Sequence, residues 1–427
     1  MTKRGNGPAR TGVSRRRFLA SAALAGCAAG RLSHASPPAA TGDQASRLVS
    51  LRPGGGDKSF DPWIEIDAAA FRHNVKEVSR LAGGTPIMAV VKNNAYGLGD
   101  TLVGPLLAAC DEVVGIGCVR VAEAIAMREA GVTKPILNMA EVTDTEAAEL
   151  VSRNVWLSPW LDDAGQRLDR LARRFERPIP VHLYLDTGLG REGMPYHRAL
   201  PWMADLAGRR SVRLDGTYMM FTHDLEFDRE QLARFVQLAG NARARGLRLG
   251  RLHASPSYEL FFLPDARLDM VRVGNALFGN HVDDKAKGLA DLKPVFRLCA
   301  RVVRVEQLRP GDGVNFRREY VASRPTWTAL LPVGHVDGYP ADASGTCRVL
   351  VNGRLYPVVG AVSSTHTIVE LGDEKTVNVG DVATLIGPDD PEIDPHVVAT
   401  RTRVGFYRMI TKLNALLPRR VVGAGRS

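Results

Sequence analysis

Short apolar runs alternate with longer amphipathic segments between Trp63 and Gly279, and this alternation restricts the fold more than any other feature of the sequence. Strand, helix, strand repetition of this kind implies parallel strands covered by helices. About seven or eight such units within about 220 residues favour a closed (β/α)8 barrel of the TIM type over an open sheet. The apolar runs that predict strands are residues 86–92, 113–119, 135–139, 181–186, 216–221 and 270–274.

Composition divides the rest of the chain. Beyond Asp291 the sequence changes to short strand patterns separated by turns, as on either side of Gly353, which predicts a mostly β domain. A stretch rich in Pro, Ala, Ser and Gly precedes the first strand pattern at Trp63 and is typical of a flexible tether. The predicted parts are an export signal (1–35), a linker (36–61), the barrel (62–290) and the C-terminal β domain (291–427).

The N-terminus has the order of an export signal, with basic residues followed by an apolar run of small residues. Arg15 and Arg16 before Phe18 resemble the twin-arginine signal, whose pathway carries folded proteins, so we expect a periplasmic or other extracytoplasmic location. Residues 24–27 also resemble a lipobox, in which Cys27 would be lipidated. The alternative is cleavage elsewhere in the hydrophobic region.

Charge and cysteine usage exclude several classes of protein. The formal net charge is +10, but seven basic residues and no acidic one lie in the first 42, so the remainder carries only +3. A nucleic-acid partner is therefore not expected. Apart from Cys27, the cysteines form no C-x-x-C pair or short-spaced His/Cys cluster, so we expect free thiols and no metal site. They are Cys110, Cys118, Cys299 and Cys347.

Lys92 is the first candidate catalytic residue. It ends the apolar run that begins at residue 86, and reactive residues of a parallel barrel lie at the carboxyl ends of strands. A lysine held against an apolar strand can lose its proton and act as a nucleophile toward a carbonyl group. Taken alone, such a lysine is more often a surface or salt-bridge residue.

Residues 89–99, AVVKNNAYGLG, resemble the pyridoxal-phosphate attachment motif of the alanine racemase family, and residues 63–67 resemble the first strand of that family. The resemblance covers about residues 62–420 and implies the barrel, the β domain, a racemase of alanine or another amino acid, and a homodimer with shared active sites. Further matches follow in order at residues 123–137, 181–193, 269–279, 331–339 and 404–407.

The resemblance also implies how the cofactor is held. Lys92 would bind pyridoxal 5'-phosphate covalently. A backbone N–H at a glycine can approach an anion closely because no side chain intervenes, which suits Gly274. The residues expected around the phosphate are Tyr96, Ser257, Gly274, Asn275 and Tyr407.

Two arginines complete the implied site. Arg272 would face the pyridine nitrogen, and because a guanidinium neither accepts nor releases a proton near neutral pH, the ring nitrogen would stay largely unprotonated. A weaker electron sink favours simple exchange of the α-proton over transamination. Arg191 would lie near the cofactor's phenolic oxygen and the substrate carboxylate. The alternative for Arg191 is a local ion pair with Glu192 or Asp186.

Several active-site positions depart from the family. Phe316 stands where the family has a tyrosine that the partner subunit donates as the second base, and a missing general base typically costs about 10² to 10⁴ in rate. Tyr184 replaces a lysine, Met220 replaces a histidine, and His335 replaces a tyrosine. Residues 363–366 differ as well. These active-site positions differ from the family together, while the residues expected to hold the cofactor remain. This pattern indicates altered chemistry or specificity.

Four residues are candidates for the lost proton carrier: His335, His366, His223 and Tyr320. Histidine titrates near neutral pH and is a competent carrier. A structural role remains the alternative for each, and for His223 in particular. We expect His335 or His366 to act in catalysis.

Three functions fit these residues. The first is an extracytoplasmic amino-acid racemase. The second is a pyridoxal-phosphate decarboxylase or lyase, which needs only one proton carrier and so tolerates Phe316. The third is a weakly catalytic amino-acid-binding protein of the cell envelope, which the presence of Lys92, Arg272 and Tyr407 disfavours.

Overall fold

A computed structural model describes residues 59–423 of the chain. The expected signal, the possible lipidation site at Cys27 and nearly all of the expected linker lie outside these residues. No helix in the described range is long and apolar enough to cross a membrane. The thiols of Cys110, Cys118, Cys299 and Cys347 are free, and the last three are buried.

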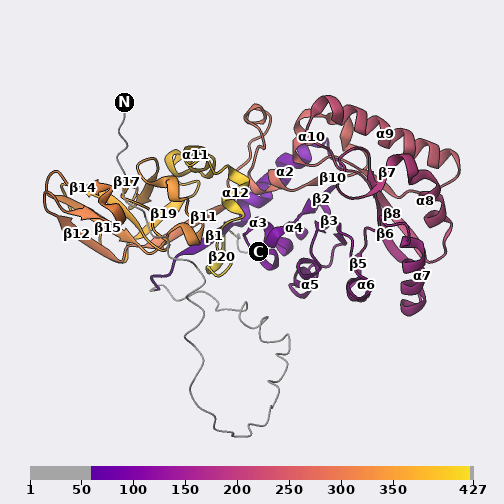
Figure 1. Cartoon of the computed structure of the whole chain (residues 1–427), viewed down its shortest axis with the longest axis horizontal. Coiled ribbons are helices and arrows are strands. Elements are labelled where there is room, and N and C mark those ends of the chain that lie inside the picture. Colours follow the sequence, from indigo (N-terminus) through magenta and orange to yellow (C-terminus); the bar gives the residue numbers. More distant parts are fainter. Residues whose placement is uncertain (1–58, 424–427) are drawn as a thin grey trace, which may run out of the picture. The chain divides into compact units, whose positions relative to one another are not determined.

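The predicted parallel barrel is confirmed (Figure 1). Hydrogen bonds order its strands as β10-β2-β3-β4-β5 and as β6-β8-β9. Parallel bridges from Leu157 to Val181 and from His253 to Met270 join the two groups, so the eight strands close on themselves. The strands are β2 (Ile87–Val90), β3 (Val113–Cys118), β4 (Ile136–Asn138), β5 (Val155–Trp156), β6 (Ile179–Asp186), β8 (Val212–Tyr218), β9 (Arg251–His253) and β10 (Val271–Val273).

Helices cover the barrel because each presents an apolar stripe to the strands. In α5 the buried residues are Glu123, Ala124 and Met127, and Gly131 follows the helix with a φ of +90°, the left-handed conformation that ends helices at low cost in glycine. The covering helices are α2 (Ala68–Leu81), α4 (Asp100–Ala108), α5 (Val121–Glu129), α6 (Asp144–Ser152), α7 (Ala164–Phe175), α8 (Tyr196–Gly208), α9 (Leu225–Ala244) and α10 (Ser257–Phe262).

A small cluster separate from the main core fills the barrel interior. It takes one residue from each of β2, β4, β6 and β8, and Met270 immediately before β10. Contributions from alternate strands are the usual way in which a closed eight-stranded barrel is packed. The layer consists of Met88, Leu137, Tyr184, Tyr218 and Met270, and it forms the floor beneath the carboxyl ends of the strands.

The second domain is built on a nine-stranded sheet in the order β12-β15-β18-β17-β16-β19-β11-β1-β20. Strand β1 (Trp63–Asp67) pairs antiparallel with β11 and parallel with β20, so the segment assigned to the barrel also contributes a strand to the β domain. The other members are β11 (Phe296–Arg301), β12 (Arg304–Leu308), β15 (Thr326–Leu331), β16 (Arg348–Val351), β17 (Arg354–Val359), β18 (Thr367–Gly372), β19 (Val382–Ile386) and β20 (Arg419–Val422).

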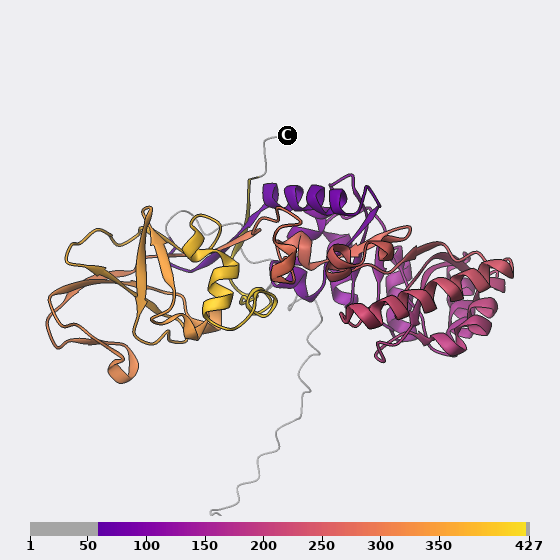
Figure 2. The same ribbon diagram turned by 90° about the horizontal axis from the view of Figure 1, so that it is seen from above.

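The predicted turn at Gly353 joins β16 to β17. Asn352 and Gly353 have φ values of +51° and +74°, the combination that tight hairpins favour. The short strands β13 (Gly313–Val314) and β14 (Tyr320–Val321) pair with each other, and the helices α11 (Pro395–Arg401) and α12 (Phe406–Ile410) lie between β19 and β20 in the chain (Figure 2).

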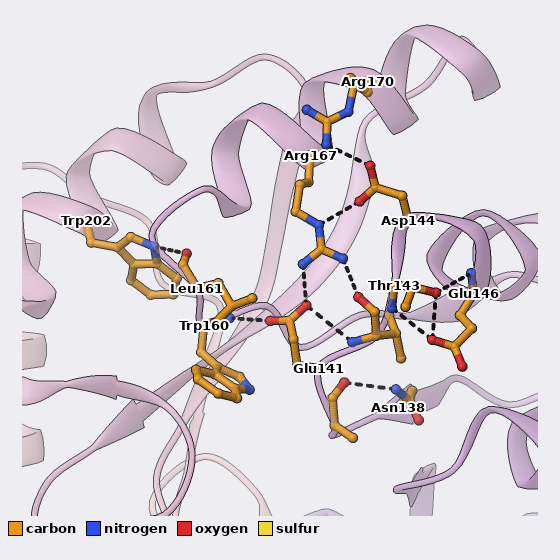
Figure 3. A network of polar contacts seen from close by, with 12 residues as sticks. Asn138, Glu141, Thr143, Asp144, Glu146, Trp160, Leu161, Arg167, Arg170 and Trp202 are labelled. Atoms are coloured by element: carbon orange, nitrogen blue, oxygen red, sulfur yellow. Dashed lines mark hydrogen bonds and ion pairs between the residues drawn. The ribbon is translucent and has the colours of Figure 1, made fainter.

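A polar network ties the loop after β4 to the loop before α7 (Figure 3). The Glu141 carboxylate accepts from the backbone N–H of Trp160 at 3.2 Å and from the Arg167 guanidinium at 2.7 Å. Arg167 also binds Asp144 at 2.7 Å, and Arg170 binds the other oxygen of Asp144 at the same distance. The network thereby fixes two loops at the end of the barrel that carries the site.

Replacing Arg167 with Ala should lower the free energy of unfolding by about 2 to 4 kcal/mol, because the largely buried Glu141 would lose its cation. The control is Arg170→Ala: Arg170 pairs with the same Asp144, but its side chain is 51% exposed where that of Arg167 is 12% exposed. That variant should lose less than about 1 kcal/mol. Urea denaturation followed by circular dichroism would measure both values, and equal losses would contradict the assignment.

Candidate active site

The site is a cavity of about 490 Å³ at the carboxyl ends of the barrel strands. Its walls bring together eight of the residues expected from the sequence, from β10, from the segments that follow β2, β6, β9 and β10, and from α12. These eight are Lys92, Tyr96, Arg191, Ser257, Arg272, Gly274, Asn275 and Tyr407. The cavity is also lined by Tyr184, Tyr218, Met220, His223, Tyr258, Asn280 and Val282.

A left-handed turn, α3 (Asn93–Tyr96), follows Lys92. All four of its residues have φ between +52° and +54°, and the Tyr96 N–H donates to the Lys92 carbonyl at 2.8 Å. Left-handed backbone costs L-residues about 1–2 kcal/mol each, although Asn tolerates it better than most. Strain of this kind persists only where surrounding structure enforces it, and it is concentrated at functional sites.

Buried groups hold that turn in place. The carboxylate of Glu123 accepts from the backbone N–H groups of Asn94, Val119 and Arg120 at 3.0–3.3 Å. From the C-terminal segment, Arg419 donates to the Gly97 carbonyl at 2.7 and 3.2 Å. Burial lowers the pKa of Arg419 to about 10, so its guanidinium still carries its charge at neutral pH.

The environment of Lys92 favours the neutral amine. Burial lowers the pKa of Lys92, and the positive charges of Arg191 and Arg272 lower it further. The carboxylates of Glu123 and Glu192 oppose this effect but do not reverse it. The neutral amine is the form that attacks carbonyl groups and accepts protons, and a lowered pKa increases the fraction of lysine in that form.

Arg272 is a buried cation whose hydrogen-bond partners, among the described residues, include no carboxylate. It donates to the Met219 carbonyl at 2.7 Å and to Nδ1 of His253 at 3.0 Å, and it lies 4.7 Å above the Tyr218 ring. Desolvation lowers its pKa, but guanidinium remains charged at physiological pH. Its charge therefore acts on the cavity rather than on a neighbouring anion.

Two histidines behind Arg272 stay neutral. Burial lowers the pKa of His182 to about 3 and holds the pKa of His253 well below its usual value. Because His253 accepts from Arg272 at Nδ1, its proton lies on Nε2, which donates to Nδ1 of His182 at 2.8 Å. This chain of hydrogen bonds orients the guanidinium without neutralising it.

The opposite end of the cavity has neutral polar groups. The buried ring of Tyr96 packs against Phe278 at 4.4 Å and meets the edge of Tyr407 at 5.6 Å. The hydroxyl of Ser257 accepts from the Ala276 N–H at 3.1 Å. At Gly274 an added Cβ would come within 2.1 Å of the Tyr96 hydroxyl, so that close approach requires glycine. Hydroxyls and bare backbone of this kind suit a phosphate group.

Arg191 lies on a loop that Asp186 shapes. The Asp186 carboxylate accepts from the backbone N–H groups of Gly188 and Gly190 at 2.9–3.2 Å. Asp186 is thus used locally, and the Arg191 guanidinium lies 3.8 Å from Glu192 and also acts on the Tyr184 phenol, whose pKa it helps to lower against the effect of burial. A contact of that length between partly exposed side chains is weak, which leaves Arg191 able to bind an anion in the cavity.

The structure divides the four candidate proton carriers. His335, His366 and Tyr320 do not line the cavity of their own chain, and both histidines are exposed. Phe316 is 71% exposed on the loop between β13 and β14. His223 does line the cavity, and its Nδ1 is 2.8 Å from the carboxylate of the fully buried Glu259. Sequence reasoning missed Glu259, since no local pattern links it to His223.

A closed parallel barrel with a strand-end lysine and a neutral anion cradle, joined to a β domain, defines the class of pyridoxal-phosphate-binding barrel enzymes. The chain belongs to the alanine racemase family: residues 66–282 match the model "Alanine racemase, N-terminal domain" and residues 295–421 match "Alanine racemase, C-terminal domain".

Individual relatives agree with the family match. The chain is 32% identical over 374 residues to an alanine racemase from Desulfovibrio desulfuricans, covering 84% of this chain and 98% of that protein. It resembles the solved alanine racemase of Streptomyces coelicolor at 30% identity with a TM-score of 0.76, covering 85% and 98% of the two chains. The Bacillus anthracis enzyme, solved with bound L-Ala-P, matches at 25% identity and a TM-score of 0.75, covering 86% and 97%.

The residues present fit pyridoxal phosphate, the cofactor of this family. Because Gly274 has no side chain, the Tyr96 hydroxyl lies against its backbone, and both residues line the cavity with Ser257, where they could bind the phosphate. Lys92 offers an amine whose pKa is lowered by burial, and Arg272 offers a cation without a carboxylate partner among the described residues. All of these residues line the same cavity, which is therefore the candidate cofactor site.

We predict that Gly274→Ala weakens pyridoxal-phosphate binding by about tenfold or more, because the new methyl group would occupy the space beside the Tyr96 hydroxyl. Gly288→Ala is a matched control, because a Cβ at Gly288 meets nothing within 4 Å. Titration of cofactor-free protein followed by absorbance would give both dissociation constants. Unchanged affinity in Gly274→Ala would show that the phosphate is bound elsewhere.

Proposed function

We propose that the protein interconverts the L and D forms of a free amino acid, and that the amino acid is alanine, as the names of its relatives indicate. The observation that carries the proposal is the position of Lys92 in one cavity with Arg272 and the residues of the phosphate cradle, where burial lowers the pKa of the amine. When bound, the cofactor delocalises the electron pair left on the substrate α-carbon after a proton is removed.

The chain's own residues then have distinct tasks. Lys92 binds the cofactor covalently and carries one proton. Tyr96, Ser257, Gly274, Asn275 and Tyr407 hold the phosphate, and the hydroxyl of Tyr407 accepts a hydrogen bond from Asn93 at 3.1 Å.

Each arginine has one role. Arg191 lines the cavity and would bind the substrate carboxylate near the cofactor's phenolic oxygen. Arg272 would face the pyridine nitrogen, and because a guanidinium does not give up its proton there, the nitrogen would stay unprotonated, which limits electron withdrawal and disfavours transamination.

We further propose a homodimer in which each site is completed by the partner subunit. The exposure of Phe316 is compatible with this arrangement, because its ring projects from a surface loop where a partner subunit could contact it. Asn315, Arg317 and Arg318 around it all have positive φ, so the loop projects the ring in an enforced conformation.

Export is proposed from the sequence alone. The basic run with Arg15 and Arg16 before an apolar stretch supports twin-arginine transport and an extracytoplasmic location, with lipidation at Cys27 as a further option. Fractionation of cells that express the Arg15→Lys/Arg16→Lys double variant should show the protein retained in the cytoplasm. Unchanged export would contradict the proposal.

Wild-type protein incubated with L- or D-alanine in heavy water should exchange the α-hydrogen and invert the centre, while Lys92→Ala should do neither. Lys76→Ala, at an exposed helical lysine, is the control and should keep full activity. Borohydride reduction followed by peptide mapping should find a pyridoxyl group on Lys92. Decarboxylation or cleavage products without inversion would replace the racemase with a single-base enzyme.

Light scattering should show a dimer, and a fully active monomer at working concentration would contradict shared sites.

If Phe316 of one subunit borders the substrate in the other, Phe316→Tyr should raise the rate of racemisation, because it adds a proton-carrying phenol. An unchanged rate in a confirmed dimer would place residue 316 away from the substrate carbon.

A further inference from the structure

We infer that His223, oriented by the buried carboxylate of Glu259, is the proton carrier that serves the face of the substrate opposite Lys92. The inference rests on the proposed racemase function and names the group that compensates for the missing hydroxyl at Phe316. Sequence reasoning favoured His335 or His366 for this role, but neither lines the cavity of its own chain.

His223 is held in the cavity wall by its backbone and by its neighbours. It follows β8 and has a φ of +67°, a conformation that costs a non-glycine residue about 1–3 kcal/mol unless the surroundings enforce it. The edge-on ring of Tyr258 lies 5.2 Å from the imidazole. Tyr258 and Glu259 both belong to α10, so one short helix fixes both the position and the hydrogen bond of His223.

The ion pair determines which nitrogen faces the substrate. Because Glu259 accepts at 2.8 Å from Nδ1, that nitrogen carries a proton and Nε2 is the one that can gain or lose another. In the described part of the chain Nε2 has no hydrogen-bond partner. Orientation of an imidazole by a buried carboxylate is the general arrangement by which histidine serves as an acid and a base.

The electrostatics suit donation of a proton near neutral pH. The hydrogen bond that His223 donates to Glu259 raises the pKa of His223. The negative charges of Glu259 and Asp228 add to that effect, while burial opposes it. Burial in turn raises the pKa of Glu259, which the imidazole opposes. The second oxygen of Glu259 is buried with no partner among the described residues, so His223 is its main stabilising contact.

The barrel topology places the two carriers at separate positions around the rim of the cavity. Lys92 follows β2 and His223 follows β8, and around the closed barrel β9 and β10 separate these strands in one direction and β3 to β6 in the other. Both side chains line the same cavity. A substrate carbon between them would therefore meet one group on each face.

The proton balance closes over one turnover. In one direction the Lys92 amine takes the α-proton as the Cα–H bond breaks, and Nε2 of protonated His223 supplies the proton for the new bond on the other face. The reverse direction exchanges these roles, with no net oxidation or reduction. To return to the starting state, Lys92 must release the proton it took and His223 must regain one. The His223 side chain is 52% exposed, so water can restore its proton, and water in the cavity can accept the proton from Lys92.

The test compares His223→Gln with wild type in heavy water, using alanine as the probe. Racemisation should fall by about 10² to 10⁴ through kcat, with KM little changed. Exchange of the α-hydrogen without inversion should persist for the enantiomer whose hydrogen faces Lys92. His197→Gln, at an exposed histidine on α8, is the matched control and should retain wild-type rates.

Glu259→Gln tests the positioning role through the titration of His223. With the carboxylate removed, the pKa of His223 should fall, so its NMR titration in the holoenzyme should move to lower pH. The limb of the pH–rate profile that His223 sets should move the same way: the basic limb in the direction in which protonated His223 donates, and the acidic limb in the reverse direction, in which the neutral imidazole accepts. In this variant, Asp228 is the charged group that still acts on the imidazole, and Tyr258 is the other titratable residue beside it. An unmoved titration would overturn the pairing.

Two results would overturn the inference while leaving the racemase function intact: wild-type rates of racemisation in His223→Gln, or a selective loss of inversion in His366→Gln or His335→Gln instead. If the wild-type protein itself fails to racemise alanine, the proposed function fails first. The shift of the His223 titration would then still report whether the pair with Glu259 exists.

Discussion

The strained turn after Lys92 is the constraint on which the rest of the site depends. Four successive left-handed residues carry the chain from the end of β2 past the catalytic amine and into Tyr96. Glu123 from the barrel and Arg419 from the C-terminal segment both bind this turn. An added Cβ at Gly97 would lie 2.4 Å from the carbonyl of Ile410, so close packing of the C-terminal segment also depends on it.

The cavity has two electrostatic environments that act in opposite directions. Around Lys92, burial and two guanidinium groups lower the pKa of the amine. Around His223, a buried carboxylate raises the pKa of the imidazole. The ordinary pKa values of a lysine and a histidine lie far apart, and these two environments bring the pKa values of Lys92 and His223 closer to each other.

The residues that depart from the family are packed into the site rather than loosely accommodated. The Tyr184 ring stacks on Tyr218 at 4.5 Å, and the sulfur of Met220 accepts from Arg272 at 2.7 Å. Burial raises the pKa of the Tyr184 phenol, and the positive charges of Arg191 and Arg272 oppose that shift. The residues at positions 184 and 220 therefore take part in the packing and charge balance of the site.

The sequence by itself determined the barrel, because alternating apolar runs and amphipathic segments report the local periodicity of strands and helices. The resemblance of contiguous motifs also predicted Lys92, Tyr96 and Gly274 as cofactor residues, and the structure brings all three to one cavity. Sequence could not show that β1 joins the sheet of the second domain, because strand pairing is set by long-range hydrogen bonds. Nor could it choose among the histidines: His223 and Glu259 are 36 residues apart, and only closure of the barrel brings the loop after β8 against α10 and buries the carboxylate that orients the imidazole.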